Sequence, residues 1–458
     1  MRLNFMNRSD ELRRLKKAFS GKEGSFCCLY GRRRCGKSRL LQECLPEEKS
    51  VYYVADESEA ALQRNLLARQ ITGQLRNFDQ VAYPDWNSLL ERWFNEAQKG
   101  SVLALDEFPY LAAVSPELPS VLQKFADRLP LKGAHMAICG SSQRMMQGLV
   151  LDSNAPLYGR AKEIIHVKPL GAGWISEALK LSVASEALAA FAVWGGVPRY
   201  WELAAEYAST WDAVKELVLE PSGVLHDEPW RLLLDDLRDA VQPASILSLI
   251  GQGCHRISEI AGRLGKPATS LSRPLQRLID LGFIRREYPF GLNEKNTKRT
   301  VYRISDPFFL FWSQYVQPNR SRLDSGEAVR VQQEIRRESG RHIGQIWEEL
   351  VRLAVPRLEI GGRSWSTAGR WWGTGLDGAD MECDVVAESV DQKVLLVGEV
   401  KMDIDLRKAE RLMAELESKA RRLPHVGRYE KILPVIFSCS KTQTQRHVSL
   451  TDVLSVLK

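Results

Sequence analysis

Glycine, lysine and serine residues near the amino terminus are spaced as phosphate binding requires. An apolar run, Phe26–Leu29, precedes a pattern of glycine, four residues, glycine, lysine and serine, and an apolar helical pattern follows it. The candidate binding residues are Gly31, Arg32, Arg33, Arg34, Cys35, Gly36, Lys37, Ser38 and Arg39. In such a strand, loop and helix, backbone N–H groups and the helix amino end face phosphate oxygens, the lysine adds positive charge, and the serine hydroxyl can bind Mg²⁺. The pattern predicts a P-loop; the alternative is a glycine-rich basic surface loop.

Two adjacent carboxylates end an apolar strand further along the chain. Val102–Leu105 is followed directly by Asp106 and Glu107. In a P-loop protein the first carboxylate at this place orders the ligands of Mg²⁺, and the second can polarise the water that attacks the γ-phosphate. Acidic pairs at strand ends are common in α/β proteins, so this prediction depends on the P-loop before it. We expect Asp106 at the metal and Glu107 as the catalytic base, with Lys37 as their catalytic partner.

Two further polar residues follow at places from which they could act on the γ-phosphate. Ser141 comes after the strand-like segment Ala134–Gly140 and could hold the attacking water or sense the phosphate, although a serine here can equally cap the next helix. Arg160 could stabilise the charge that develops on the phosphate, from its own subunit or from a neighbouring one. The neighbouring subunit would require a homo-oligomer. A surface arginine in a turn is the simpler alternative.

Length and composition limit the classes of protein to which the chain can belong. Its 458 residues exceed one ordinary core, and 44% hydrophobic and 26% charged residues are typical of a folded protein. A net charge of +7 permits a nucleic-acid partner without requiring one. Eight cysteines without a C-x-x-C pair argue against a disulfide framework or a zinc site. With no apolar run of membrane-spanning length and no signal-peptide core, we expect a cytoplasmic protein without a membrane partner.

Five motifs together resemble those of a known family. They are Gly31–Ser38, Leu105–Leu111, Cys139–Ser142, Leu157–Arg160 and Gly195–Tyr200, in that order. In these residues the chain is similar to the archaeal-type ATPase family, a branch of the STAND group of AAA+-related P-loop NTPases. The resemblance implies ATP and Mg²⁺ as cofactors and a RecA/AAA-like sheet followed by a helical lid. It also implies that Asn7 and Arg8 lie near the adenine and that Pro198 of the lid lies near the nucleotide base.

Residues 241–305 combine three short helical patterns with a predicted β-hairpin. Helices are expected from Ser245, Ile257 and Ala268, and two alternating segments, Phe283–Tyr288 and Arg299–Ile304, follow. This order predicts a winged helix-turn-helix, whose third helix would enter a DNA major groove. The groups that could contact DNA are Thr269, Ser270, Ser272, Arg273, Gln276 and Arg277 of the third helix and the basic wing segment Asn293–Arg299. The alternative is a structural module that packs against the ATPase.

The last part of the chain carries a second group of charged residues on predicted strands. Glu399 and Lys401 alternate onto one face of a strand, and Asp384 on the neighbouring strand can reach that face. The two carboxylates can bind Mg²⁺ or Mn²⁺ and, with the lysine, orient a water for attack on a phosphodiester. The array resembles the PD-(D/E)xK nuclease superfamily, which implies a further glutamate from an upstream helix, Glu348. In this chain Cys383 occupies the position of the proline that gives the superfamily its name. The alternative to a nuclease-like site is that these charged residues lie on a solvated strand edge.

The predicted fold class is α/β, with four modules in order along the chain. They are a P-loop ATPase core at 1–170, a helical lid at 171–240, a winged helix-turn-helix at 241–305 and an α/β restriction-endonuclease-like domain at 306–458. We expect an Mg²⁺-dependent ATPase that couples ATP hydrolysis to the binding or cleavage of a nucleic acid, DNA above all. The alternative is a regulatory or signalling ATPase whose last domain only binds DNA or a protein.

Overall fold

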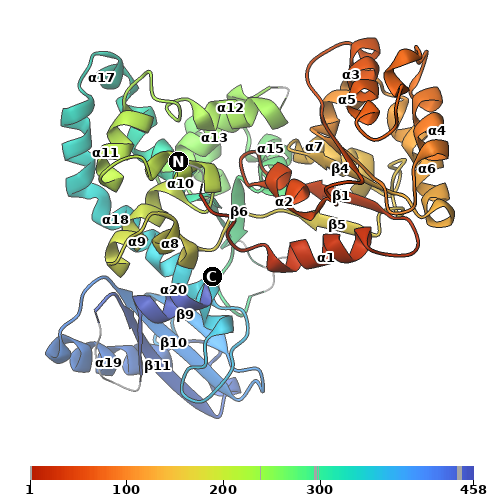
Figure 1. Ribbon diagram of the computed structural model, residues 1–458. Helices are drawn as coiled ribbons and strands as arrows, with labels where there is room; N and C mark the ends of the chain where they lie inside the picture. Colours follow the sequence, from red (N-terminus) through yellow and green to blue (C-terminus); the bar gives the residue numbers. More distant parts are fainter. Residues whose placement is uncertain (1–2, 238, 293–296, 298, 441–445) are drawn as a thin grey trace. The chain divides into compact units, whose positions relative to one another are not determined.

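A computed structural model describes residues 3–237, 239–292, 297, 299–440 and 446–458. The chain forms two compact units (Figure 1). Met6–Pro169 makes up the N-terminal unit, and Met1–Phe5 with Leu170–Lys458 makes up the C-terminal unit. Across the described ranges, no helix is both long enough and apolar enough to cross a bilayer.

A parallel sheet forms the centre of the N-terminal unit. Its strands lie in the order β2–β3–β4–β1–β5, and every neighbouring pair is parallel. Their bounds are β1 (Phe26–Tyr30), β2 (Ser50–Val54), β3 (Val102–Asp106), β4 (His135–Gly140) and β5 (Glu163–His166). As far as the described residues go, the sheet has five strands, which confirms the predicted parallel α/β sheet. The carboxyl ends of β1, β3 and β4 therefore meet at one edge of the sheet.

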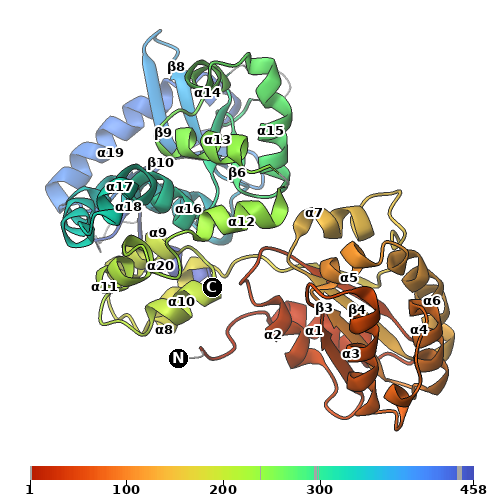
Figure 2. The same ribbon diagram turned by 90° about the horizontal axis from the view of Figure 1, so that it is seen from above.

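Helices cover both faces of this sheet (Figure 2). Their bounds are α1 (Ser9–Phe19), α2 (Lys37–Cys44), α3 (Ala60–Thr72), α4 (Trp86–Glu96), α5 (Phe108–Val114), α6 (Leu118–Lys132) and α7 (Gln143–Met146). Helices α3 to α6 share a buried apolar core with Phe26, Leu103 and Ile138 of the sheet. Helices α1 and α2 pack against the strands from the other face. Because successive strand residues point to opposite faces, strands buried on both faces read as continuous apolar runs.

The C-terminal unit begins with short helices, in the segment predicted to be a lid. Their bounds are α8 (Ile175–Ala178), α9 (Ala184–Trp194), α10 (Pro198–Ala204), α11 (Thr210–Val214) and α12 (Glu228–Asp236). Gly195 follows the last residue of α9 with a φ of 56°, and Pro198 is the first residue of α10. Glycine after one helix and proline at the start of the next are common stop and start signals. The role of this segment as a lid stays a prediction.

Three helices and a hairpin follow in the order that the sequence predicts. Their bounds are α13 (Val241–Gly251), α14 (Ile257–Leu264), α15 (Ala268–Asp280), β6 (Ile284–Glu287) and β7 (Val301–Ile304). β6 and β7 pair antiparallel. Leu271, Leu275 and Leu278 of α15 are buried. Asn293–Asn296 and Lys298 of the predicted wing lie outside the described residues, and identity as a winged helix-turn-helix stays a prediction.

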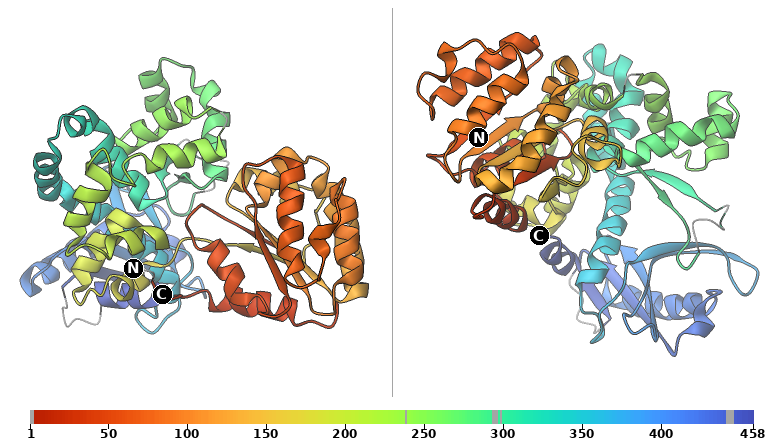
Figure 3. Two further views of the ribbon diagram at one scale, coloured as in Figure 1. Left: turned by 45° about the horizontal axis from the view of Figure 1, so that its top comes forward. Right: turned by 90° about the vertical axis from the view of Figure 1, so that its right-hand side faces the viewer.

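A mixed sheet forms the last part of the C-terminal unit. The elements are α16 (Pro307–Phe311), α17 (Arg320–Asp324), α18 (Ala328–Ala354), β8 (Gly369–Thr374), β9 (Asp380–Glu388), β10 (Val394–Lys401), α19 (Leu406–Arg421), β11 (Lys431–Ser438), β12 (His447–Ser449) and α20 (Leu450–Val456). Strands lie in the order β12–β11–β10–β9–β8; β9 is antiparallel to β8 and β10, whereas β10, β11 and β12 are parallel. The cyan helix α18 in Figure 3 reaches β9 and β10. Likeness to a restriction endonuclease stays a prediction.

Candidate functional site

The loop between β1 and α2 depends on glycine at both of its ends. At Gly31, where φ is 146°, an added Cβ would lie 2.4 Å from the carbonyl oxygen of Val167. Only glycine lets the end of β1 pass so close to the residue that follows β5. Gly36 has a φ of 86° and precedes the first turn of α2, which starts at Lys37. The amino end of α2 therefore opens directly onto the loop, as a P-loop requires.

Lys37 is buried, and its ammonium group lies on the loop. The side chain is 5% exposed, and Nζ donates a hydrogen bond to the carbonyl oxygen of Arg32 at 3.1 Å. A buried ammonium gains from an anionic partner, so this placement fits a phosphate. The other predicted loop residues differ in exposure: Cys35 is buried, Arg32, Arg34 and Arg39 are half-buried, and Arg33 is exposed. Arg39 lies 3.8 Å from the carboxylate of Glu43.

Ser38 and Asp106 are linked through a residue that sequence analysis missed, Tyr52 of β2. The Tyr52 hydroxyl donates a hydrogen bond to Asp106 Oδ2 at 2.5 Å, and the Ser38 side chain is near enough to act on the pKa of the same hydroxyl, in the lowering direction. Asp106 is buried, and its Oδ1 accepts from the backbone N–H of Glu107 at 2.8 Å. Burial and the charge of Asp106 raise the pKa of Tyr52, so the phenol keeps its proton. Oxygen donors brought together in this way fit Mg²⁺.

Glu107 and Ser141 contact each other across the edge of the sheet. Ser141 Oγ donates a hydrogen bond to Glu107 Oε2 at 2.8 Å. Glu107 has a φ of 50°, a left-handed conformation that is unusual for a residue other than glycine. Ser142, not Ser141, caps α7, where its hydroxyl accepts from the backbone N–H of Met145 at 3.4 Å. A serine at this place therefore does cap the next helix, but it is Ser142, and the Ser141 hydroxyl contacts the predicted base.

Arg8 contacts the backbone of the P-loop through its guanidinium group. It is 6% exposed, and its guanidinium donates to the backbone carbonyls of Cys35, at 3.3 Å, and of Lys168. It also pairs with Glu11 at 3.2 Å. Arg8 and its half-buried neighbour Asn7 both have positive φ. The resemblance implies adenine near these residues, and the structure places the Arg8 guanidinium against the P-loop backbone.

Arg160 lies at the opposite edge of the sheet from the loop. β5 is parallel to β1, with Glu163 beside Cys27, so Arg160 is level with the chain before β1. Its guanidinium donates to Asp127 of α6 at 3.0 Å. The structure therefore does not support action on the phosphate of its own subunit, and action on a neighbouring subunit stays a prediction. Pro198 belongs to the other compact unit, at the first position of α10.

The predicted D…E-x-K residues come together on adjacent strands of the C-terminal unit. Asp384 Oδ2 accepts from the backbone N–H of Val400 at 2.9 Å, beside Glu399. Lys401 Nζ donates to Glu399 Oε1 at 2.9 Å, and Lys419 of α19, which sequence analysis missed, donates to Oε2 at 3.0 Å. Burial alone would raise the pKa of Glu399, but these two lysines outweigh it and lower that pKa. Burial and the charge of Glu399 raise the pKa of Asp384.

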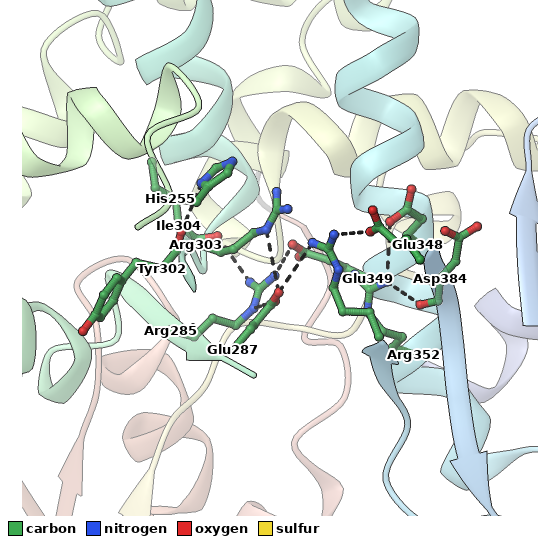
Figure 4. Close-up of polar contacts among 12 residues, drawn as sticks. His255, Arg285, Glu287, Tyr302, Arg303, Ile304, Glu348, Glu349, Arg352 and Asp384 are labelled. Atoms are coloured by element: carbon green, nitrogen blue, oxygen red, sulfur yellow. Dashed lines mark hydrogen bonds and ion pairs between the residues drawn. The ribbon is translucent and has the colours of Figure 1, made fainter. Parts of the chain in front are cut away.

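Glu348 of α18 lies beside Asp384, as Figure 4 shows. Burial and the charge of Asp384 raise the pKa of Glu348. Arg352 lies 3.5 Å from the Glu348 carboxylate and donates to the Asp384 carbonyl oxygen at 2.9 Å. Figure 4 also shows Arg285 of the β6–β7 hairpin bonded to Glu349 of α18. Ion pairs thus tie the hairpin to the helix that carries Glu348.

The carboxylate cluster does not amount to a preformed metal centre. Within the described ranges, no three or more His, Cys, Asp or Glu side chains are grouped so that they could hold a metal ion. Both oxygens of Glu399 already accept hydrogen bonds from lysine. The prediction of a metal at Asp384 and Glu399 stays a prediction.

Two family models match separate parts of the chain. A family described as an ATPase domain predominantly from Archaea matches residues 5–182. A family described as archaeal and bacterial proteins of unknown function matches residues 312–412. The second match gives no activity to the domain that contains Glu348 and Asp384.

One relative and one solved structure extend these matches. The chain is 27% identical over 437 residues to an uncharacterised protein of Methanocaldococcus jannaschii, across 94% of this chain and 95% of the relative. A Walker-type ATPase of Pyrococcus abyssi matches in structure with a TM-score of 0.52 and 20% identity, across 68% of this chain and 96% of that one. At that identity the structural match shows the fold alone. Residues 5–182 thus match an archaeal-type ATPase domain, and the N-terminal unit has a five-stranded parallel sheet like that of P-loop ATPases.

Proposed function

We propose that the N-terminal unit binds ATP with Mg²⁺ and hydrolyses it at a site made by Lys37, Ser38, Asp106 and Glu107. One observation carries this proposal. The buried lysine and the serine hydroxyl of α2 lie at the same edge of the parallel sheet as the two carboxylates at the end of β3. The match to an archaeal ATPase domain over residues 5–182 supports ATP hydrolysis in general. The roles of individual residues are the proposal.

Each residue has a separate task in this mechanism. Lys37 and the loop N–H groups bind the phosphate oxygens, and Ser38 and Asp106 would hold Mg²⁺, which when bound offsets negative charge on the phosphates. Glu107 accepts the proton of the attacking water. Ser141 donates to Glu107 Oε2, which leaves Oε1 as the oxygen available to the water. Arg8 keeps the loop in place through the Cys35 carbonyl.

Two variants separate binding from hydrolysis. Lys37→Ala should weaken ATP binding about tenfold or more, because a charge-assisted contact is lost. Glu107→Gln should keep the affinity within about threefold but lower turnover about 10²-fold to 10⁴-fold, because the base is lost. Calorimetry and a phosphate-release assay measure the two effects, with exposed Lys16→Ala as the control. ATP uptake by Lys37→Ala equal to that of the unmodified protein would refute the assignment.

For the C-terminal unit we propose that α15 binds a nucleic acid. One face of this helix is buried through three leucines, and the other carries only exposed polar groups at the predicted contact positions. These are Thr269, Ser270, Ser272, Arg273, Gln276 and Arg277. A duplex binds such a face through phosphate and base-edge contacts, and its affinity falls with salt. The Arg273→Ala, Arg277→Ala double variant should bind duplex DNA at least tenfold more weakly in a gel-shift titration; unchanged binding would contradict the proposal.

Cleavage by the Asp384 cluster is the second candidate function. The placement of Asp384, Glu399 and Lys401 on adjacent strands favours it. Plasmid DNA or RNA incubated with the protein, ATP and Mg²⁺ or Mn²⁺ should be cut, and Asp384→Asn should stop cleavage while ATP turnover persists. Asp391→Asn, in an exposed turn, is the matched control. If ATP is hydrolysed and neither nucleic acid is cut, the cluster is not a nuclease, and a regulatory ATPase with a non-catalytic last domain is the function that stands.

A further inference from the structure

Tyr52 connects the hydroxyl and the carboxylate that the proposed function assigns to Mg²⁺. Its hydroxyl lies 2.5 Å from Asp106 Oδ2, and the Ser38 side chain is a polar neighbour of the same hydroxyl. Asp106 comes from β3 and Ser38 from the first turn of α2. One tyrosine side chain is therefore next to polar groups from β3 and from α2, two elements that are far apart in the sequence.

The direction of each hydrogen bond follows from the number of protons available. Ionised Asp106 can only accept, so it takes the single phenol proton of Tyr52. The Tyr52 oxygen can then only accept, so in a hydrogen bond between Tyr52 and Ser38 the Ser38 hydroxyl must be the donor. Both lone pairs of the Ser38 oxygen are then directed away from Tyr52, and a cation binds a hydroxyl through such lone pairs.

The strand pairing explains how a tyrosine reaches this place. Tyr52 is opposite Ala104 in the parallel pairing of β2 with β3, and Asp106 lies two residues further on the same face. That face is the one covered by α2, whereas the next residue, Tyr53, belongs to the core with α3 on the other face.

We propose that Tyr52 is a positioning residue of the magnesium site, which orients Ser38 and Asp106 before Mg²⁺ arrives with the nucleotide. This inference rests on the proposed binding of ATP and Mg²⁺. It goes beyond it by assigning a third side chain, from β2, whose effect should appear only when the metal is present. A residue with a purely structural role would change binding equally with and without Mg²⁺.

The test compares Tyr52→Phe with Tyr53→Phe. Each variant removes one phenol hydroxyl from β2, but the Tyr53 hydroxyl donates to Gln63 of α3, away from the loop. Calorimetry measures the affinity for ADP with Mg²⁺ and with excess chelator, and the ratio of the two affinities is the quantity of interest. Tyr52→Phe should lower this ratio about tenfold, because a hydrogen bond to a charged group is lost, and change the metal-free affinity less than twofold. Tyr53→Phe should leave the ratio unchanged.

Each other outcome overturns the inference. An unchanged ratio in Tyr52→Phe means that the hydroxyl does not position the metal ligands, and an increased ratio means that it competes with the metal. An equal loss with and without Mg²⁺ means a structural role. If the unmodified, folded protein binds no ADP under either condition, the proposed ATP site itself fails, a result that is distinct from the other three.

Discussion

Removal of the Arg8 guanidinium should loosen the P-loop without unfolding the chain. The guanidinium is buried and donates to the backbone carbonyls of Cys35 and Lys168, and it pairs with Glu11. Arg8→Met keeps the aliphatic part of the side chain and deletes all of these bonds. The Cys35 carbonyl would then lose a buried hydrogen bond, whereas the bond to the exposed residue Lys168 is only partly buried.

The magnitude follows from the loss of one buried hydrogen bond from a charged donor, which is about 1.5 to 3 kcal/mol. The free energy of local opening of the loop should therefore fall by about 1.5 to 3 kcal/mol. At about 1.4 kcal/mol per factor of ten, amide hydrogen exchange in the loop Gly31–Ser38 should become roughly 10-fold to 150-fold faster. Nucleotide affinity should fall in the same direction, because part of the binding energy must then order the loop.

Hydrogen exchange followed by mass spectrometry measures this effect peptide by peptide. Arg13→Met on the same helix is the matched control, because Arg13 is exposed and forms a surface ion pair with Asp10 at 2.9 Å. Exchange of the loop amides in Arg8→Met within about twofold of that in Arg13→Met would refute the reasoning. Faster exchange over the whole N-terminal unit would point to global rather than local loosening and would also contradict it.

Three further predictions concern other parts of the molecule. Ser141→Ala should lower ATP turnover about tenfold and leave ATP affinity within about twofold, since the hydroxyl contacts Glu107; equal losses in both quantities would contradict this. Arg160→Ala should leave nucleotide affinity unchanged in calorimetry, because Arg160 lies at the far edge of the sheet against Asp127; weaker binding would disprove that placement. Burial and a neighbouring carboxylate raise the pKa of Asp384, so its charge destabilises the fold increasingly as pH rises above the ordinary value of 3.8. Asp384→Asn should therefore gain in melting temperature relative to the unmodified protein between pH 4 and pH 8, and a constant difference would contradict the sign.

Sequence patterns were sufficient for the features whose residues are close together in the chain. Gly31, Gly36 and Lys37 form one continuous motif, so the loop and the start of α2 could be predicted without tertiary information. Asp106 and Glu107 end an apolar strand, which placed them at the edge of the sheet. Strand alternation likewise predicted that Glu399 and Lys401 share a face, and they are hydrogen bonded.

Contacts between side chains of different strands and helices depend on strand order and register, and only the tertiary structure determined them. The sequences of apolar strands in a parallel sheet carry little information about which strands are neighbours. The contact of Tyr52 with Asp106 exists because β2 lies beside β3. Lys419 reaches Glu399 because α19 packs on β10. Sequence analysis suggested that Arg160 could act on the phosphate. The register of β5 on β1 instead places Arg160 at the edge of the sheet opposite the P-loop. The sequence by itself determined which groups could bind a phosphate; the packing of strands and helices determined which side chains stand beside them.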